Sequence, residues 1–437
     1  MGGDAESYIK MAKHEAFTLS NYFSIKDSKL QSIRNYEFDS KDYPYLNINE
    51  VEFWEPGYPL FLKLMFFISI DEGHNLIKML QHVFLLLSFY IWWLILKKYR
   101  LKKSHFIIIF IILVHPFFLA APQLLYTEVF DTLIMSLIYF YHLKAKENWK
   151  DYLILGLLIG FFTITESYNL PLSLVYICYL LIQSAPLKNK VLLFLAYFIP
   201  MLPVFYHNYL HTDGGFLLST KNSNNLWVSN NNLPILNFDM NESGWPLPSD
   251  YFGNEDKYSE VRKPCYVEYK KQAQCEAKHA IIFALKNPAL FIQRAYQKYK
   301  NLWSPNLFPF NKGFNIHGIG LTEKNSVIVH NIFVVFEILF TITFFFSVSI
   351  LIAGNIDKLS LTILLQLIYF HAILIFAHGM VRYRLGYMGI LTAIIFIALS
   401  KLNPTTLLRK RFILSFCFFL IFYFSVLYEK ASVVFLS

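Results

Sequence analysis

Acidic side chains that could take part in catalysis stand at three places in the chain. Asp4 and Glu6 are two residues apart in the opening stretch, and Glu55 comes directly before a proline in FWEPGYPLF. Glu128 and Asp131 are three residues apart in YTEVFDTLI, which would put them on one face of a helix. A carboxylate can accept the proton of an attacking hydroxyl group, and acids at a membrane boundary usually mark function. Each acid alone could be a hydrogen-bonded structural residue, but several on one side favour a site.

Cationic side chains gather in FAHGMVRYRLGYMG, which contains His378, Arg382 and Arg384. Arginine is always charged and binds phosphate oxygens in pairs, although arginines beside a tyrosine could also anchor the chain to lipid headgroups. Carboxylates that deprotonate a hydroxyl, with arginines that hold a phosphate leaving group, would suit glycosyl transfer from a lipid phosphate. Two further acids, Glu166 and Glu337, lie within apolar runs.

The composition predicts that membrane helices position these residues. Hydrophobic residues make up 55% of the 437 positions, aromatic residues 18% and charged residues 16%. The net charge of +9 would suggest nucleic acid in a soluble protein. Here Lys and Arg cluster in short connections between apolar runs, where they set orientation instead. We therefore expect no nucleic-acid partner.

Apolar runs predict an all-α polytopic membrane protein with about ten transmembrane helices and a mixed extracytoplasmic loop domain. The run from Asp151 to Ile182 is broken by TITESYNLP, which predicts two short spans that meet at a turn. The expected domains are 1–74, 75–209, 210–326 and 327–437. The span centres are expected near Leu86, Ile112, Met135, Gly156, Tyr176, Tyr197, Leu339, Leu367, Ile394 and Phe419.

Basic connections recur at every second loop, as KKYRLKK, LKAKENWK, LKNK and LLRKR, and this alternation predicts that those loops are cytoplasmic. The acidic stretches, the long loop and both termini would then face outside. In that loop AKHAIIFALKNPALFIQRAYQKYKNLW has apolar residues at helical spacing and is expected to be a helix on the membrane surface.

Four cysteines are present, of which Cys178 and Cys417 lie in apolar runs and are expected to be inert packing residues. Cys265 and Cys275 lie in the long loop and could pair in an oxidising compartment. If both lie on one helix, ten residues separate them by about 15 Å. That separation argues against a disulfide, which needs less than about 7 Å between Cα atoms.

Six stretches in order resemble the GT-C glycosyltransferases: GGDAESYIKMA, PGYPLFL, TEVFDTLIMSL, NNLWVSNN, AKHAIIFALKNPALFIQRAYQKYKNLW and VRYRLGYMGI. The chain is most similar to bacterial relatives of protein O-mannosyltransferases and of the transferase that adds aminoarabinose to lipid A. The resemblance covers nearly the whole chain. Each motif alone is weak, and their common order carries the resemblance.

The resemblance implies roles for individual residues. Asp4 matches a first-loop acid that engages the acceptor, with Glu6 near a second carboxylate, and Glu128 matches a further catalytic acid. Glu55 resembles an acid that contributes to a site for a divalent metal ion or for the donor in some members. Arg382 and Arg384 match the arginines of the motif that lies near the donor phosphate, and His378 of the same cationic stretch is assigned to that phosphate from the residues alone. The chain departs from the family at Ala5, at Gly386, where a proline is usual, and at Glu166, where an arginine is usual.

The expected function is transfer of a sugar from a polyprenyl-phosphate donor to a glycan, lipid or protein hydroxyl outside a bacterial cytoplasmic (inner) membrane. The alternatives are a flippase for lipid-linked oligosaccharides and an O-antigen ligase or polymerase. A flippase predicts inverted repeats, and the sequence shows none.

An amino terminus that lies outside without a signal peptide is hard to translocate. The resembling family has one span before its first acidic loop. We therefore expect the natural protein to begin upstream, with a span of about 20 apolar residues that ends before Gly2.

Overall fold

The computed structural model describes most of the apolar chain and parts of its connections. The described residues are 4–13, 55–68, 73–97, 115, 118, 121–123, 127–144, 148–166, 168–182, 185–211, 218–219, 223, 226–227, 229–230, 269–305, 323–354, 357–376, 384, 387–402 and 404–434. Within these ranges every regular element is a helix, so the all-α prediction is confirmed there.

The chain divides into two compact units, and each draws on separated stretches of sequence. Unit 1 comprises Met1–Leu87, Leu124–Ile235 and Asp250–Phe291, and unit 2 comprises Ser88–Gln123, Leu236–Ser249 and Ile292–Ser437. One boundary between them falls inside helix α6 (Gly73–Lys97) and another inside α16 (Pro288–Leu302).

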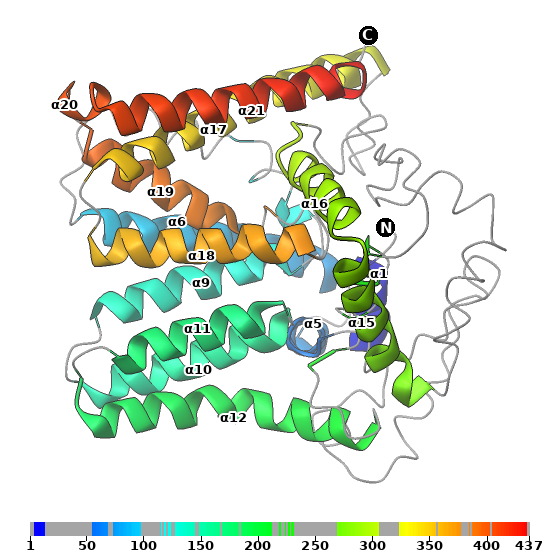
Figure 1. The fold of residues 1–437 in the computed structure, drawn as a ribbon. Coiled ribbons are helices and arrows are strands. Elements are labelled where there is room, and N and C mark those ends of the chain that lie inside the picture. The colour runs from blue at the N-terminus through cyan, green and yellow to red at the C-terminus, as the bar shows by residue number, and fades with distance from the viewer. Residues whose placement is uncertain are drawn as a thin grey trace, which may run out of the picture. The chain divides into compact units, whose positions relative to one another are not determined.

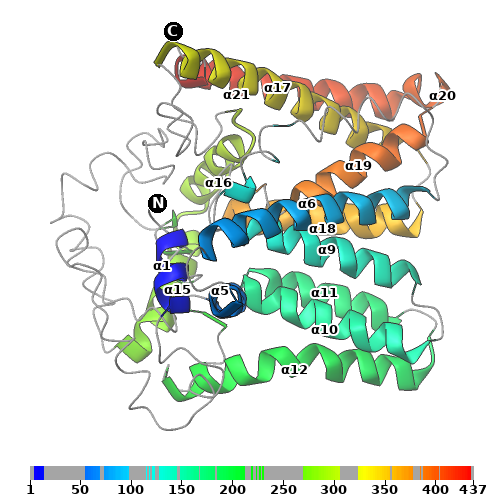
Figure 2. The same cartoon turned by 180° about the vertical axis from the view of Figure 1, so that it is seen from behind.

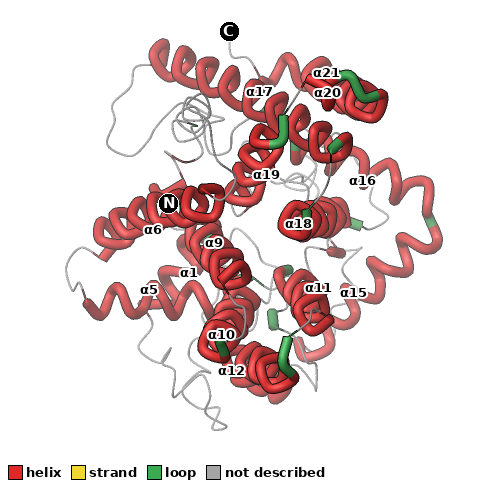
Figure 3. The backbone as a smooth tube through the Cα atoms, turned by 90° about the vertical axis from the view of Figure 1, so that its left-hand side faces the viewer, coloured by secondary structure: helices red, strands yellow, loops and turns green. Residues whose placement is uncertain are grey.

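Unit 1 is built around α10 (Trp149–Thr165), which packs along α12 (Leu187–His211) (Figure 1). Two glycines allow this approach, because a Cβ at Gly156 would lie 2.5 Å from the Leu193 carbonyl oxygen, and one at Gly160 would overlap the Tyr197 carbonyl oxygen. Small residues four apart are a common device where membrane helices meet. Figure 3 shows α10, α11 and α12 nearly end-on. The other helices here are α1 (Asp4–Lys13), α5 (Gly57–Ile68), α9 (Glu128–Lys144), α11 (Asn169–Ile182) and α15 (Tyr269–Lys286).

Unit 2 is built around α17 (Glu323–Ala353), which packs against α21 (Lys410–Val434) and α19 (Met388–Ser400). Figure 2 shows α17 and α21 side by side. Their contact is aromatic: the rings of Phe345 and Phe419 stack with centroids 4.9 Å apart. The unit also contains α18 (Lys358–Phe376), the short α20 (Pro404–Leu407) and the 3-10 turn η1 (Ala121–Gln123).

Among the described residues, four helical stretches are long and apolar enough to cross a membrane: Asn75–Ile95, Leu187–Tyr209, Asn331–Ala353 and Lys410–Tyr428. Large apolar side chains are exposed along them, as at Leu86, Leu195 and Phe418, and lipid would cover such a surface. All but one of the expected span centres lie in described helices, whereas Ile112 lies outside the described residues. A helical membrane protein is therefore supported, while ten crossings, the orientation and the four-part domain division stay predictions.

One local prediction is confirmed and others need correction. α10 ends at Thr165 and α11 begins at Asn169, so the chain turns at TITESYNLP as expected. The expected surface helix is broken by Pro288 into α15 and α16. Cys275 of α15 is disulfide-bonded, whereas Cys265 lies outside the described residues, so whether these two cysteines pair stays a prediction. The other two cysteines are exposed free thiols and not packing residues.

Candidate functional site

Besides Asp151 and Glu276, four carboxylates are buried among the described residues of unit 1, each at the end of a helix or close to one. Glu55 precedes α5, Glu128 opens α9, Asp131 lies in the first turn of α9, and Glu166 caps the carboxyl end of α10. None of their side chains is more than 5% exposed. Burying an acid is costly unless hydrogen bonds compensate, so the donors around this acidic cluster decide whether it can persist.

Hydroxyl groups supply several of those hydrogen bonds. Thr127 Oγ1 donates to Glu166 Oε1 at 2.7 Å, and Thr165 Oγ1 donates to Asp131 Oδ1 at 2.5 Å. Ser219 Oγ donates to Glu55 at 2.9 Å. In each case one carboxyl oxygen of the acid accepts the hydrogen bond. The acidic cluster is thus held by neutral donors that come from three separate parts of unit 1.

Two tyrosines lie beside these acids and connect them to α1 and α5. Tyr8 of α1 donates to Glu166 Oε1 at 3.5 Å and meets the ring of Tyr58 edge-on, with centroids 5.4 Å apart. Tyr58 of α5 accepts a hydrogen bond of 2.6 Å from Gln81 Nε2. α1 begins at Asp4, and the Asp4 position lies four residues before Tyr8, on the same face of the helix. The predicted first-loop acid therefore belongs to a helix that is docked at the acidic cluster.

The structure describes Asp4 and Glu6 only as helical positions of α1. Both stay predicted catalytic residues, as does Glu128. The PGYP motif has a clear packing role: a Cβ at Gly57 would lie 2.7 Å from the Ile164 carbonyl oxygen. Only glycine allows the start of α5 this close to the end of α10, which brings Tyr58 to the acidic cluster.

The predicted metal role of Glu55 is not tested. Within the described part of the chain, no three His, Cys, Asp or Glu side chains converge in a way that could hold a metal ion. One oxygen of Glu55 accepts the hydrogen bond from Ser219. Divalent metal binding at Glu55 thus stays a prediction from the resemblance.

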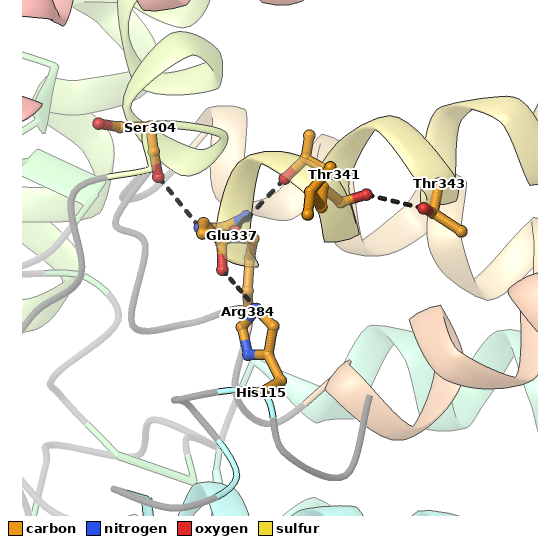
Figure 4. A network of polar contacts seen from close by, with 7 residues as sticks. His115, Ser304, Glu337, Thr341, Thr343 and Arg384 are labelled. Atoms are coloured by element: carbon orange, nitrogen blue, oxygen red, sulfur yellow. Dashed lines mark hydrogen bonds and ion pairs between the residues drawn. The ribbon is translucent and has the colours of Figure 1, made fainter. Parts of the chain in front are cut away.

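A second buried polar network lies in unit 2, and Figure 4 shows it. Arg384 forms an ion pair with Glu337 of α17 and donates to the Ser304 carbonyl oxygen at 3.1 Å. His115 Nε2 lies 2.9 Å from the other Glu337 oxygen, and Thr341 Oγ1 donates to the first at 3.4 Å. The Arg384 guanidinium also lies over the Trp303 ring, 5.4 Å from its centroid. Arg384 and Glu337 are both only 1% exposed.

Sequence reasoning singled out Arg384 and Glu337 separately but missed both their pairing and His115. An available signal was the position of His115 in an apolar run, since ionisable residues inside membrane segments usually have charged or polar partners. The other residues assigned to the donor phosphate, Arg382 and His378, lie outside the described residues. The assignment of all three stays a prediction.

Further buried cations lie on α16, at Arg294 and Lys298, one helical turn apart. Lys298 Nζ donates to the carbonyl oxygen of Phe376, the last residue of α18, at 3.1 Å. Burial lowers the pKa of Lys298 to about 7, and the neighbouring Arg294 charge adds to this effect. Near neutral pH this lysine can therefore gain or lose its proton.

No protein-family model, curated protein or solved structure matches this chain.

Proposed function

We propose that this chain is an integral membrane glycosyltransferase. It would move a sugar from a polyprenyl-phosphate-linked donor to a hydroxyl of a glycan, lipid or protein on the extracytoplasmic face of a bacterial cytoplasmic membrane. The proposal is supported by the order of the six motifs and by four helices apolar enough to cross a membrane.

The observation that carries the proposal is the convergence of three motifs in unit 1. α1, which begins with the first-loop acid, contacts α5 of the PGYP motif through the rings of Tyr8 and Tyr58. The same tyrosine of α1 and Thr127, beside the acid of the TEVFD motif, both donate to Glu166. Segments that are far apart in sequence thus surround one group of buried acids, as a proton-accepting site requires.

The reaction that we propose breaks and forms one bond at the anomeric carbon. An acceptor hydroxyl oxygen attacks that carbon, its proton passes to a carboxylate, and the bond from the carbon to the phosphate oxygen breaks. The polyprenyl phosphate leaves with the electron pair. We assign proton acceptance to Asp4 and assisting roles to Glu6 and Glu128. A general base typically contributes about 10²–10⁴-fold to the rate.

The arginine motif would stabilise the departing phosphate. Glu337 and the Ser304 carbonyl already contact the Arg384 guanidinium, so a phosphate would bind this arginine beside Glu337 or in exchange for it. Arg382 and His378 are assigned to the same phosphate from the sequence.

The direct test incubates the purified protein in liposomes with a radiolabelled polyprenyl-phosphate sugar and an acceptor fraction. Release of free polyprenyl phosphate with label on the acceptor supports transfer. Movement of the intact donor to the other leaflet, without cleavage, would instead identify a flippase.

The matched variants are Asp4→Asn and Asp151→Asn. Asp151 lies near the start of α10, close to Lys144, with 3.5 Å between the charged atoms, and is not assigned to the site. We expect Asp4→Asn to reduce transfer at least a hundredfold and Asp151→Asn to retain it. Unchanged turnover in Asp4→Asn would remove this acid from the mechanism.

A further inference from the structure

Two helix ends meet at the acidic cluster, and each carries a threonine followed by a glutamate. Thr127 and Glu128 stand at the start of α9, and Thr165 and Glu166 at the end of α10. The hydroxyl of each threonine contacts an acid at the other helix end: Thr127 donates to Glu166 and Thr165 to Asp131. The Thr165 hydroxyl is shared with the Phe162 carbonyl oxygen of its own helix, at 2.8 Å. The two hydrogen bonds are reciprocal.

The backbone closes this arrangement into a ring. The Asp131 amide donates to the Thr127 carbonyl oxygen at 2.8 Å, so Asp131 in the first turn of α9 is joined to Thr127, which directly precedes that helix. Thr165 and Glu166 are adjacent in the chain and so are fixed to one another. All four side chains are at least 95% buried. We call these four residues the threonine–acid clasp.

The position of Glu166 is not explained by the stability of α10. A helix carries partial negative charge at its carboxyl end, so an acid there is unfavourable unless other groups stabilise it. Glu166 gains that stabilisation from outside its own helix. Its Oε1 atom accepts hydrogen bonds from both Tyr8 of α1 and Thr127, the residue directly before α9.

One carboxylate oxygen therefore links the helix that begins with Asp4 to the helix that begins with Glu128. We propose that the threonine–acid clasp sets the distance and angle between these two helix starts, with Glu166 as the shared acceptor. This rests on the proposed function in one respect, namely that Asp4 and Glu128 act on the substrate. The clasp members are then positioning residues, since they act through those acids.

The test compares variants that keep or remove single clasp contacts. Glu166→Gln keeps an oxygen acceptor at the side-chain end, whereas Glu166→Met removes it at similar length. Thr165→Val removes only a hydroxyl. Thr163→Val is the matched control: this threonine is in the same helix and equally buried, but it donates to Ile159 and Ser173 and is not part of the clasp.

Two readouts are measured on the full-length protein in detergent. The first is amide hydrogen exchange of residues 127–132, which reports how firmly the start of α9 is held and does not depend on activity. We expect exchange to speed up about tenfold in Glu166→Met and Thr165→Val, and to stay near wild type in Glu166→Gln and Thr163→Val.

The second readout is steady-state transfer. Misplaced catalytic groups reduce the rate by up to about a hundredfold, so we expect kcat to fall between tenfold and a hundredfold in Glu166→Met and Thr165→Val, with KM for the donor nearly unchanged. If kcat in Glu166→Gln is close to wild type while kcat in Glu166→Met is low, the result supports positioning by the hydrogen-bond acceptor at the end of the residue 166 side chain.

The outcomes separate this inference from the proposed function. Unchanged exchange in Glu166→Met and Thr165→Val would overturn the clasp whatever the activity. Faster exchange with unchanged kcat would overturn its positioning role. A wild-type protein with no transfer activity would refute the proposed function, and the exchange data alone would then decide whether the clasp holds α9.

Discussion

The ion pair between Arg384 and Glu337 gives the sharpest test of the packing in unit 2. The change is Glu337→Gln, which keeps the side-chain shape and removes its charge. Arg384 would then keep its hydrogen bond to the Ser304 carbonyl oxygen at 3.1 Å and its contact with the Trp303 ring, whose centroid is 5.4 Å away. It would lose the ion pair with the Glu337 carboxylate. Because the guanidinium is only 1% exposed, water cannot replace that partner.

The expected cost follows from this burial. Removing one partner of a buried ion pair typically costs about 3–5 kcal/mol, because the other charge stays buried without compensation. At about 1.4 kcal/mol per factor of ten, the ratio of folded to unfolded protein should fall by roughly a hundredfold to several thousandfold. The reverse change, Arg384→Met, should cost less, because His115 at 2.9 Å still contacts the Glu337 carboxylate.

The assay is equilibrium unfolding in mixed micelles, followed by far-ultraviolet circular dichroism. The double variant should be more stable than the sum of the two single losses implies, by about 0.5–3 kcal/mol. Thr343→Val is the control, since this threonine donates to Leu339 of its own helix and lies outside the ion pair (Figure 4). A Glu337→Gln protein within about 0.5 kcal/mol of wild type, or strictly additive losses, would refute this reasoning.

Three further predictions concern packing, pH and orientation. Gly160→Ala should destabilise the protein by about 1–3 kcal/mol in the same assay, because its Cβ would overlap a backbone carbonyl of α12; Gly354→Ala, whose nearest contact would be 3.1 Å away, should cost less. Lys298 has a pKa lowered to about 7, so the unfolded chain binds more protons between pH 7 and about 10.5, and stability should rise with pH in that window. Lys298→Met should abolish that part of the slope, and an unchanged slope would contradict the assignment. Cysteines at Asn148 and Lys278, both exposed, should react with impermeant reagents from opposite sides of the membrane once the two free cysteines are replaced; labelling of both from one side would overturn the predicted topology.

The sequence by itself determined that this chain forms helices, several of them long and apolar enough to cross a membrane. Long apolar runs must form helices in lipid, because each backbone polar group needs a partner within its own segment. The break at TITESYNLP could be predicted for a similarly local reason, since an acid, an asparagine and a proline interrupt the apolar pattern there. The common helix face of Glu128 and Asp131 followed from their spacing alone.

Only the tertiary structure decided which polar residues meet. Thr127 and Glu166 are 39 residues apart, and Arg384 and Glu337 are 47 apart, so no local pattern could pair them. Helical periodicity tells which face of a helix a residue occupies, but not which other helix covers that face. The partners are set by the packing of whole helices. For example, glycines without a Cβ allow α10 to pack closely against α12, and α5 against the end of α10. The acids were therefore visible in the sequence, while their hydrogen-bond donors became apparent only in the fold.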